Sequence, residues 1–154
     1  MIQQGAVKRG AVLSMVGGMI MAMWAMIALA ASGDGFWAPL DLIAHTIWSG
    51  APLDGSFHAR ATLIGIVAHL RTSVTVGITI TALTGRSASR IVAAAMTVSL
   101  GAWLEAANVW PALDTVAAAL FPTWTLAIGH LMFGAAVTLG VAPSRRHPQH
   151  ALAG

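Results

Sequence analysis

The chain has 154 residues, of which 57% are hydrophobic and only 8% are charged. An ordinary soluble domain carries about 25% charged residues, so this composition indicates that lipid surrounds much of the chain. It excludes a disordered chain, which needs low hydrophobicity and high charge. The net charge of +3 provides no basic stripe for binding a nucleic acid. The chain has no cysteine, which excludes disulfides and thiolate metal sites.

Four segments are long and apolar enough to cross a membrane, which takes about 20 mostly apolar residues. We predict these spans at about 10–31, 61–83, 91–110 and 123–141. The first follows two basic residues, as in a signal peptide, but its apolar stretch exceeds the roughly 7–15 residues of a signal sequence. We therefore interpret it as a retained span. The predicted fold is all-α: a four-helix transmembrane bundle over residues 1–142, followed by a basic cytoplasmic tail at 143–154.

Positively charged residues gather on one side of these spans. They precede the first span, lie between the second and third, and follow the fourth; they are Lys8, Arg9, Arg86, Arg90, Arg145 and Arg146. Such residues mark the cytoplasmic side of a membrane protein, so we predict that both termini are cytoplasmic. The opposite side carries Asp34, Asp41, Asp54, Asp114 and one base, Arg60.

Two short helices are predicted on that opposite side, at about 39–48 and 111–121. In the first, apolar residues recur at i, i+3, i+4 and i+7, while Asp41 and His45 share the other face. We expect this helix to lie in the membrane interface with its polar face in water. The second has a similar apolar pattern, with prolines placed to begin and end it.

The two halves of the chain resemble each other. The sequence W-A-P-L-D follows the first span and W-P-A-L-D follows the third, and the second and fourth spans each carry a His-Leu pair at matching places. Each half would then be a span, an interfacial helix and a span. Two spans return the chain to its starting side, so such repeats would be related by an axis along the membrane normal. The alternative is a chance likeness in a small alphabet.

The repeat would place His69 and His130 at equal depth, about 12 Å below the outer ends of their helices at 1.5 Å per residue. Two imidazoles on facing helices of an apolar bundle are the arrangement that holds a b-type haem or a metal ion. The alternative is that each histidine hydrogen-bonds to a hydroxyl or carbonyl group of a neighbouring helix. Both interpretations stay open, with His69 and His130 as candidate axial ligands.

Arg71 and Glu105 are ionisable residues inside predicted spans, where a charge costs about 2.5–3.5 kcal/mol even on the most lenient scale. An ion pair between them would reduce that cost, since the arginine side chain can extend along its helix. Such a pair is either a structural lock between the second and third spans or part of an ion path.

Three residues on the outer side, Asp41, His45 and His58, have side chains that suit copper or zinc. Their spacing does not define a complete ligand set, and the alternative is a solvated polar surface. The first span is rich in methionine, a soft ligand that suits copper, and the alternative is that these residues pack or face lipid. They are Met15, Met19, Met21, Met23 and Met26.

Small residues recur at every fourth position of the first span and predict close packing against another helix, of this chain or of a partner. They are Gly10, Ser14, Gly18 and Ala22.

The stretch G-F-W-A-P-L-D-L-I-A-H-T at 35–46 resembles a motif, GFW-x-P-L-N-L-I-A, of small four-span bacterial membrane proteins of unassigned function. In those proteins a histidine follows inside the second span, where His69 stands. Asp41 replaces their usual asparagine. The resemblance implies a four-span architecture in the bacterial inner membrane, and it implies no activity.

The sequence has no phosphate loop, nucleophile elbow or zinc-protease motif, which argues against an enzyme. We expect a membrane protein that packs with other helices, as an accessory subunit of a complex or as a homo-oligomer. One alternative is a redox protein that binds haem b or a metal ion through His69 and His130. Another is a small transporter or channel that uses Arg71 and Glu105.

Overall fold

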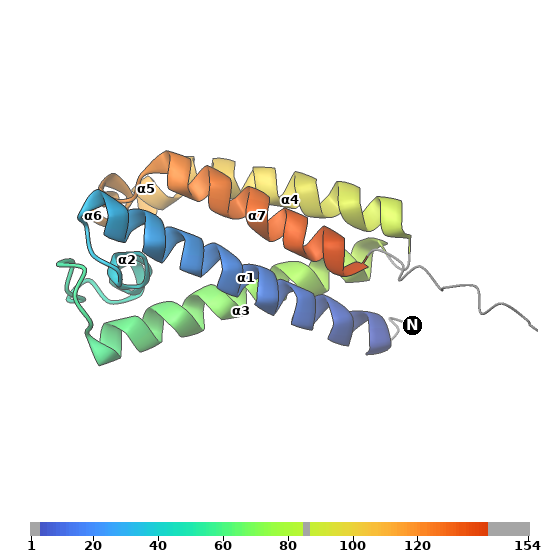
Figure 1. Ribbon diagram of the computed structural model, residues 1–154, viewed down its shortest axis with the longest axis horizontal. Coiled ribbons are helices and arrows are strands. Elements are labelled where there is room, and N and C mark those ends of the chain that lie inside the picture. Colours follow the sequence, from blue (N-terminus) through green and yellow to red (C-terminus); the bar gives the residue numbers. More distant parts are fainter. Residues whose placement is uncertain (1–3, 85–86, 142–154) are drawn as a thin grey trace, which may run out of the picture.

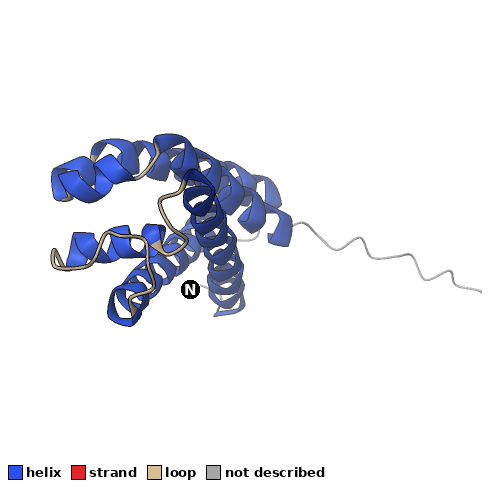
Figure 2. Cartoon of the chain, turned by 60° about the vertical axis from the view of Figure 1, so that its left-hand side comes forward, coloured by secondary structure: helices blue, strands red, loops and turns tan. Residues whose placement is uncertain are grey.

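The computed structural model describes residues 4–84 and 87–141, apart from a few side chains, among them that of Glu105. The predicted basic tail at 143–154 lies outside the described residues. Within the described residues all regular secondary structure is helical, and loops join the helices (Figure 2). The helices are α1 (Gln4–Ser32), α2 (Ala38–Ile47), α3 (Ala59–Thr84), α4 (Ala88–Asn108), α5 (Trp110–Leu113), α6 (Thr115–Leu120) and α7 (Thr123–Val141).

Three helical regions are long and apolar enough to cross a membrane, namely Val7–Ser32, Ala59–Thr84 and Ala88–Leu113. They confirm the helical class and the membrane character of the chain. The apolar part of α7, Thr123–Leu139, is shorter, so the count of four spans stays a prediction.

The four long helices pack side by side (Figure 1). Helix α1 packs along α3 and α7, and α7 also packs along α4, whereas α3 and α4 contact each other much less. The short helices α2, α5 and α6 gather at one end of the bundle, which we call the α2 end. Helix α1 begins and α7 ends at the other, the terminal end.

The close contact of α1 with α3 depends on small residues. A Cβ on Gly77 of α3 would overlap the side chain of Ser14, and a Cβ on Gly18 would lie 2.5 Å from the Ser73 hydroxyl oxygen. Lipid does not drive apolar side chains together, so helices in a membrane gain contact by bringing backbones close. The small-residue stripe predicted in the first span therefore packs within this chain, through Gly10, Ser14 and Gly18; Ala22 lies further along, beside a cavity.

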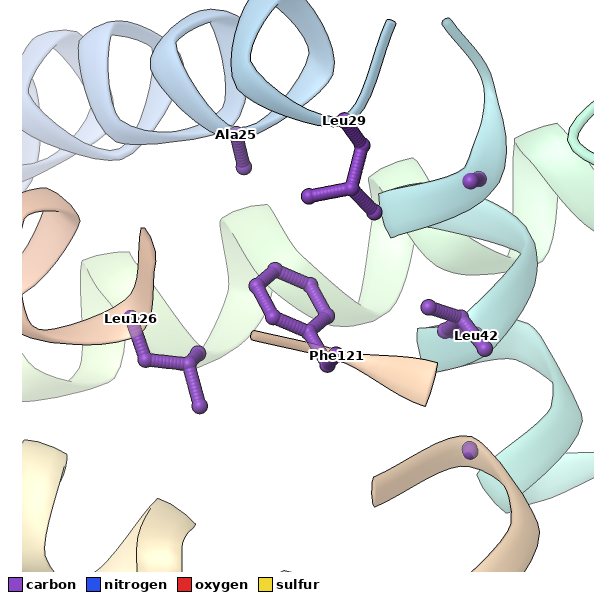
Figure 3. Close-up of a cluster of buried hydrophobic side chains, with 7 residues drawn as sticks. Ala25, Leu29, Leu42, Phe121 and Leu126 are labelled. Carbon is purple, nitrogen blue, oxygen red and sulfur yellow. The ribbon is translucent and has the colours of Figure 1, made fainter. Parts of the chain in front are cut away.

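Two clusters of buried apolar side chains hold the ends of the bundle. At the α2 end, Leu29, Leu42 and Phe121 join α1, α2 and the segment between α6 and α7 (Figure 3). A second cluster, which includes Ile80 and Phe133, joins α3, α4 and α7. The cavities described below lie among the long helices, beside these two clusters.

Helix α2 does not lie with a polar face in water, so that prediction was wrong. It packs against α3, where its backbone approaches so closely that a Cβ on Gly65 would overlap the Leu40 carbonyl group. Asp41 is fully buried and His45 is mostly buried. Because Gly65 has no side chain, α2 can pack closely against α3, and both faces of α2 contact other parts of the chain.

The second predicted interfacial helix, at 111–121, is two helices rather than one. Asp114 is extended (φ −152°, ψ 90°) and separates α5 from α6. Its carboxylate accepts a hydrogen bond from the Ala117 N–H at 3.0 Å and caps the start of α6. Aspartate is among the preferred N-cap residues, which explains why a new helix begins here.

Candidate functional site

His69 of α3 and His130 of α7 line one cavity of about 100 Å³ between the long helices. Met21 of α1 and Ser99 of α4 line it as well, so all four long helices contribute. The structure therefore brings together the two histidines that the sequence singles out.

Each imidazole is oriented by a backbone carbonyl group. His69 donates its Nε2–H to the Gly18 carbonyl oxygen at 2.9 Å, across the close contact of α3 with α1. His130 donates its Nδ1–H to the Leu126 carbonyl oxygen at 2.8 Å, within its own helix. A carbonyl oxygen can only accept, so these bonds fix which nitrogen of each ring carries the proton. The Nδ1 atom of His69 and the Nε2 atom of His130 keep their lone pairs.

A second cavity, of about 410 Å³, extends from the first toward the α2 end. The two share Met21, His69 and Thr72 in their linings. Apolar side chains form most of the second wall, with Thr46 and Trp110 among its few polar groups. This lining has the character of a small-molecule site, where a few polar groups are set in an apolar surface.

The cavity between the histidines does not fit a haem. Its volume of about 100 Å³ corresponds to roughly three water molecules, well below the roughly 300 Å³ of the smallest typical ligand pockets. The Nε2 atom of His69 also faces a carbonyl oxygen rather than open space. This cavity therefore gives no support to a b-type haem between His69 and His130, and haem ligation stays a prediction.

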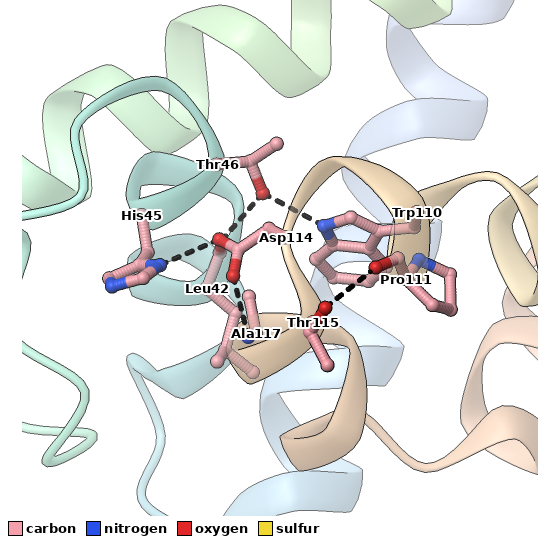
Figure 4. Close-up of polar contacts among 8 residues, drawn as sticks. All are labelled: Leu42, His45, Thr46, Trp110, Pro111, Asp114, Thr115 and Ala117. Carbon is pink, nitrogen blue, oxygen red and sulfur yellow. Dashed lines mark hydrogen bonds and ion pairs between the residues drawn. The ribbon is translucent and has the colours of Figure 1, made fainter.

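The α2 end of the larger cavity is held by polar contacts between α2 and the α5–α6 segment (Figure 4). The Nδ1 atom of His45 lies 2.6 Å from an Asp114 carboxylate oxygen, and Trp110 donates its indole N–H to the Thr46 hydroxyl at 2.8 Å. Burial alone would raise the pKa of Asp114, but the hydrogen bonds from the Ala117 N–H and from His45 lower it below its ordinary value.

Asp41 is a buried carboxyl group without a hydrogen-bond partner among the described residues. Neither carboxyl oxygen has one, and the residue is 0% exposed. Burial raises the pKa of Asp41 to about 6; the charge of His58 acts to lower it and that of Asp54 to raise it. Water does not reach this group, so Asp41 is not part of a solvated surface. Burying its carboxyl group without a hydrogen bond costs folding free energy.

The structure does not gather Asp41, His45 and His58 around one point. His45 pairs with Asp114, and His58 lies 3.0 Å from an oxygen of Asp54. Within residues 4–84 and 87–141, no three histidine or acidic side chains come close enough to share a metal ion. The outer metal site predicted from the sequence is therefore not assembled.

Arg71 is exposed near the middle of α3, away from the histidines. It lines a shallow depression of about 280 Å³ with Leu63, Ile64 and Val67 of α3 and Ile47 of α2. No side chain described in the structure forms an ion pair with it. The side chain of Glu105 lies outside the described residues, so the Arg71–Glu105 pair stays a prediction.

Among the residues that line the two cavities, Ser99 was not predicted from the sequence, and Met21 and Thr72 were considered only among several methionines and hydroxyl residues. Met21 is one of several methionines of α1, and only the direction of the small-residue stripe shows which of them faces inward. Ser99 has a fully buried hydroxyl oxygen without a partner in the described structure. Thr72 lies one turn after His69, at the i+3 spacing that places side chains on one helix face.

Comparison of the chain with family models, characterised proteins and solved structures finds no match.

Proposed function

We propose that this chain is a small four-span protein of the bacterial cytoplasmic membrane that binds a small ligand between its helices and performs no catalysis. The observation that carries this proposal is the pair of adjoining cavities, which run from the α2 end to His69 and His130. Their apolar walls and few polar groups are typical of ligand-binding sites. The sequence offers no nucleophile or acid-base pair that would add a reaction.

The four-span topology is supported by the packing of α7. This helix lies between α1 and α4 and runs along both, so a bilayer that contains those two helices also surrounds α7 (Figure 1). The basic residues then place both termini in the cytoplasm and the α2 end outside. The likeness of the two halves supports a duplication, and the GFW-x-P-L motif supports membership of the four-span bacterial proteins that carry it. Fusion reporters at Arg86 and Ser56 should report opposite sides of the membrane; the same side for both would refute the topology.

Cysteine labelling tests whether the cavities open to the outside, because the chain has no cysteine of its own. Thr72→Cys, in the wall of both cavities, should react with a charged, membrane-impermeant thiol reagent added to intact cells. Leu100→Cys, on an exposed apolar surface of α4, should stay unreactive because lipid covers it, and Ser56→Cys in the exposed loop should react fully. If Thr72→Cys is as unreactive as Leu100→Cys, the proposal fails.

A second candidate function, assembly with other membrane helices, is favoured by Arg71. An exposed arginine in the middle of a span is costly, and such residues usually pair inside a bundle. A second copy of the chain that covers the depression around Arg71 would remove the arginine from lipid. We infer a homo-oligomer on this face, in place of contact through the small-residue stripe, which α3 already occupies. The transporter alternative is less favoured, since Arg71 lies outside the two cavities.

Disulfide cross-linking tests this assembly. Val67→Cys, one turn before Arg71, should form a dimer in native membranes, and adding Arg71→Gln should abolish it. Leu104→Cys on α4 is a matched control of similar exposure and should stay monomeric. A Val67→Cys chain that remains monomeric under oxidation would exclude the assembly.

A further inference from the structure

The cavity between His69 and His130 contains more than two imidazoles. Met21 lines it from α1, and its Cγ atom lies 3.1 Å from the position that a Cβ of Gly129 would take on α7. Met21 therefore reaches across to the turn that carries His130. Three other methionines of α1 have different surroundings: Met15, Met19 and Met23 are 44%, 58% and 49% exposed on the apolar surface.

Each of the two histidines has one ring nitrogen bound to a backbone carbonyl group, as in most metal sites. A metal-binding histidine almost always donates its other N–H to a carbonyl or carboxylate, which fixes the ring and its protonation. His69 and His130 each do this with a backbone carbonyl oxygen. No described group hydrogen-bonds to the remaining nitrogen of either ring, so each keeps a lone pair that a metal ion can use.

We propose that His69, His130 and Met21 bind a single soft monovalent metal ion, Cu(I), in the cavity that they line. Imidazole nitrogen and thioether sulfur are donors that suit Cu(I). The Ser99 hydroxyl, buried and without a described partner, lines the same space and is available to a water beside the ion. A volume of about 100 Å³ accommodates an ion with one or two waters.

The charge of the site selects a monovalent over a divalent ion. Methionine and both neutral histidines carry no charge, and no aspartate or glutamate is among the described side chains that line the cavity. The cost of transferring an ion from water into an apolar interior rises with the square of its charge, and it is high even for one charge. Zn(II) or Cu(II) without a carboxylate ligand would thus be strongly disfavoured here.

The ion would enter through the larger cavity, which shares Met21, His69 and Thr72 with the site. This inference rests on the proposed function, because it names the ligand of the same cavities. The two can fail separately. If Thr72→Cys is labelled from outside but no metal binds, the ligand class is wrong and the binding function stands.

Competition with a chromophoric Cu(I) chelator measures the affinity of the purified full-length chain in detergent, under anaerobic and reducing conditions. We expect one Cu(I) per chain, and one Ag(I) when that redox-inert ion is the probe. Met21→Leu and His130→Gln should each weaken binding by at least about 100-fold, since losing even a supporting group costs about 10–100-fold. Met23→Leu, an exposed methionine of the same helix, and His58→Gln should bind like the wild type.

Two further measurements test whether the variants are folded and which atoms bind the copper. Thermal unfolding of each variant without metal shows whether it is folded, and Met21→Leu keeps the volume of the side chain if His130→Gln does not fold. X-ray absorption at the copper edge should show two nitrogen ligands and one sulfur ligand, with the sulfur signal lost in Met21→Leu. Equal affinity of the wild type, Met21→Leu and His130→Gln overturns the proposal, as does Zn(II) binding as tight as Cu(I) binding.

Discussion

Helix α3 meets two of its neighbours, α1 and α4, in different ways. Against α1 its backbone comes as close as glycine and serine allow, with Gly77 on Ser14. Toward α4 it stays apart, and the space between them holds His69, Thr72 and the two cavities. The α1–α3 interface is closely packed, whereas the α3–α4 interface contains cavities. The comparison shows that the close interface fixes the position of His69, because its imidazole is hydrogen-bonded to the Gly18 carbonyl group of α1.

The largest effect should come from disrupting the close interface. In Gly77→Val the new side chain would overlap Ser14 and the Gly10 carbonyl group, so α1 and α3 must separate. We expect a loss of about 3 kcal/mol or more in unfolding free energy, at the upper end of overpacking effects. Gly101→Val on α4 has no neighbour within 4 Å and should change stability little. Unfolding in mixed micelles, followed by circular dichroism, measures both; equal losses would contradict the contrast between the two interfaces.

The dry packing of α2 against α3 can be tested at Asp41. The folded pKa of about 6 lies above the ordinary value of 3.8, so the folded state binds the proton more tightly than the unfolded state. Ionising Asp41 in the folded state lowers the free energy of unfolding. This loss is absent below about pH 4, grows between pH 4 and 6, and is complete above pH 6. At about 1.4 kcal/mol per pKa unit, Asp41→Asn should stabilise the protein by about 3 kcal/mol at pH 7.5.

Thermal unfolding at several pH values measures this gain. It should disappear at pH 4, where the wild-type carboxyl is also neutral. Asp34→Asn, an exposed residue at the same end of the bundle, is the control and should show no comparable gain. A gain for Asp41→Asn that does not depend on pH would mean that the buried charge is not its cause.

The contact of Thr46 with Trp110 links the two halves of the chain beside the larger cavity. Thr46→Val keeps the shape of the side chain but leaves the Trp110 N–H without its acceptor. We expect a loss of about 1–2 kcal/mol, the cost of an unsatisfied buried donor, and a change in tryptophan fluorescence. Thr75→Val, which removes an exposed hydroxyl bonded only to its own helix, should be nearly neutral. If both variants behave alike, the link does not stabilise the α2 end.

The smallest effect concerns the open side of α3. Ala102 lines the cavity that holds the histidines, so Ala102→Leu should fill it. Cavity filling commonly adds about 1 kcal/mol of stability, and here it should also abolish metal binding. Ala93→Leu, on the exposed surface of α4, should leave metal binding unchanged. Retention of Cu(I) binding by Ala102→Leu would place the metal elsewhere.

The sequence predicts the long helices well, because a span needs a continuous apolar run and few other structures tolerate one. The predicted span 61–83 corresponds to Ala59–Thr84 in the structure. The nearness of His69 and His130 was inferred from the likeness of the two halves. Their hydrogen bonds nevertheless differ, since one reaches another helix and the other stays within its own.

Other features depend on contacts between residues far apart in the chain, and a helical pattern does not record them. The burial of Asp41 requires that Gly65 admit the backbone of α2, which the apolar spacing of α2 alone does not reveal. The break at Asp114, by contrast, has a local cause that the sequence contains, since aspartate is among the preferred N-cap residues. The inward direction of Met21 depends on which face of α1 meets α3.

Because the helices differ in length, the packing of this protein should depend on the thickness of the bilayer. At 1.5 Å per residue, the 29 residues of α1 extend about 43 Å and the 19 residues of α7 about 28 Å. A hydrocarbon core of about 30 Å suits α7 when it stands upright, whereas α1 and α3 must tilt to hide their apolar surface. Because α1 packs along both α3 and α7, a change in its tilt would be passed through these contacts to the gap between α3 and α4. A protein reconstituted in thinner or thicker lipids should therefore open or close the cavity in front of His69.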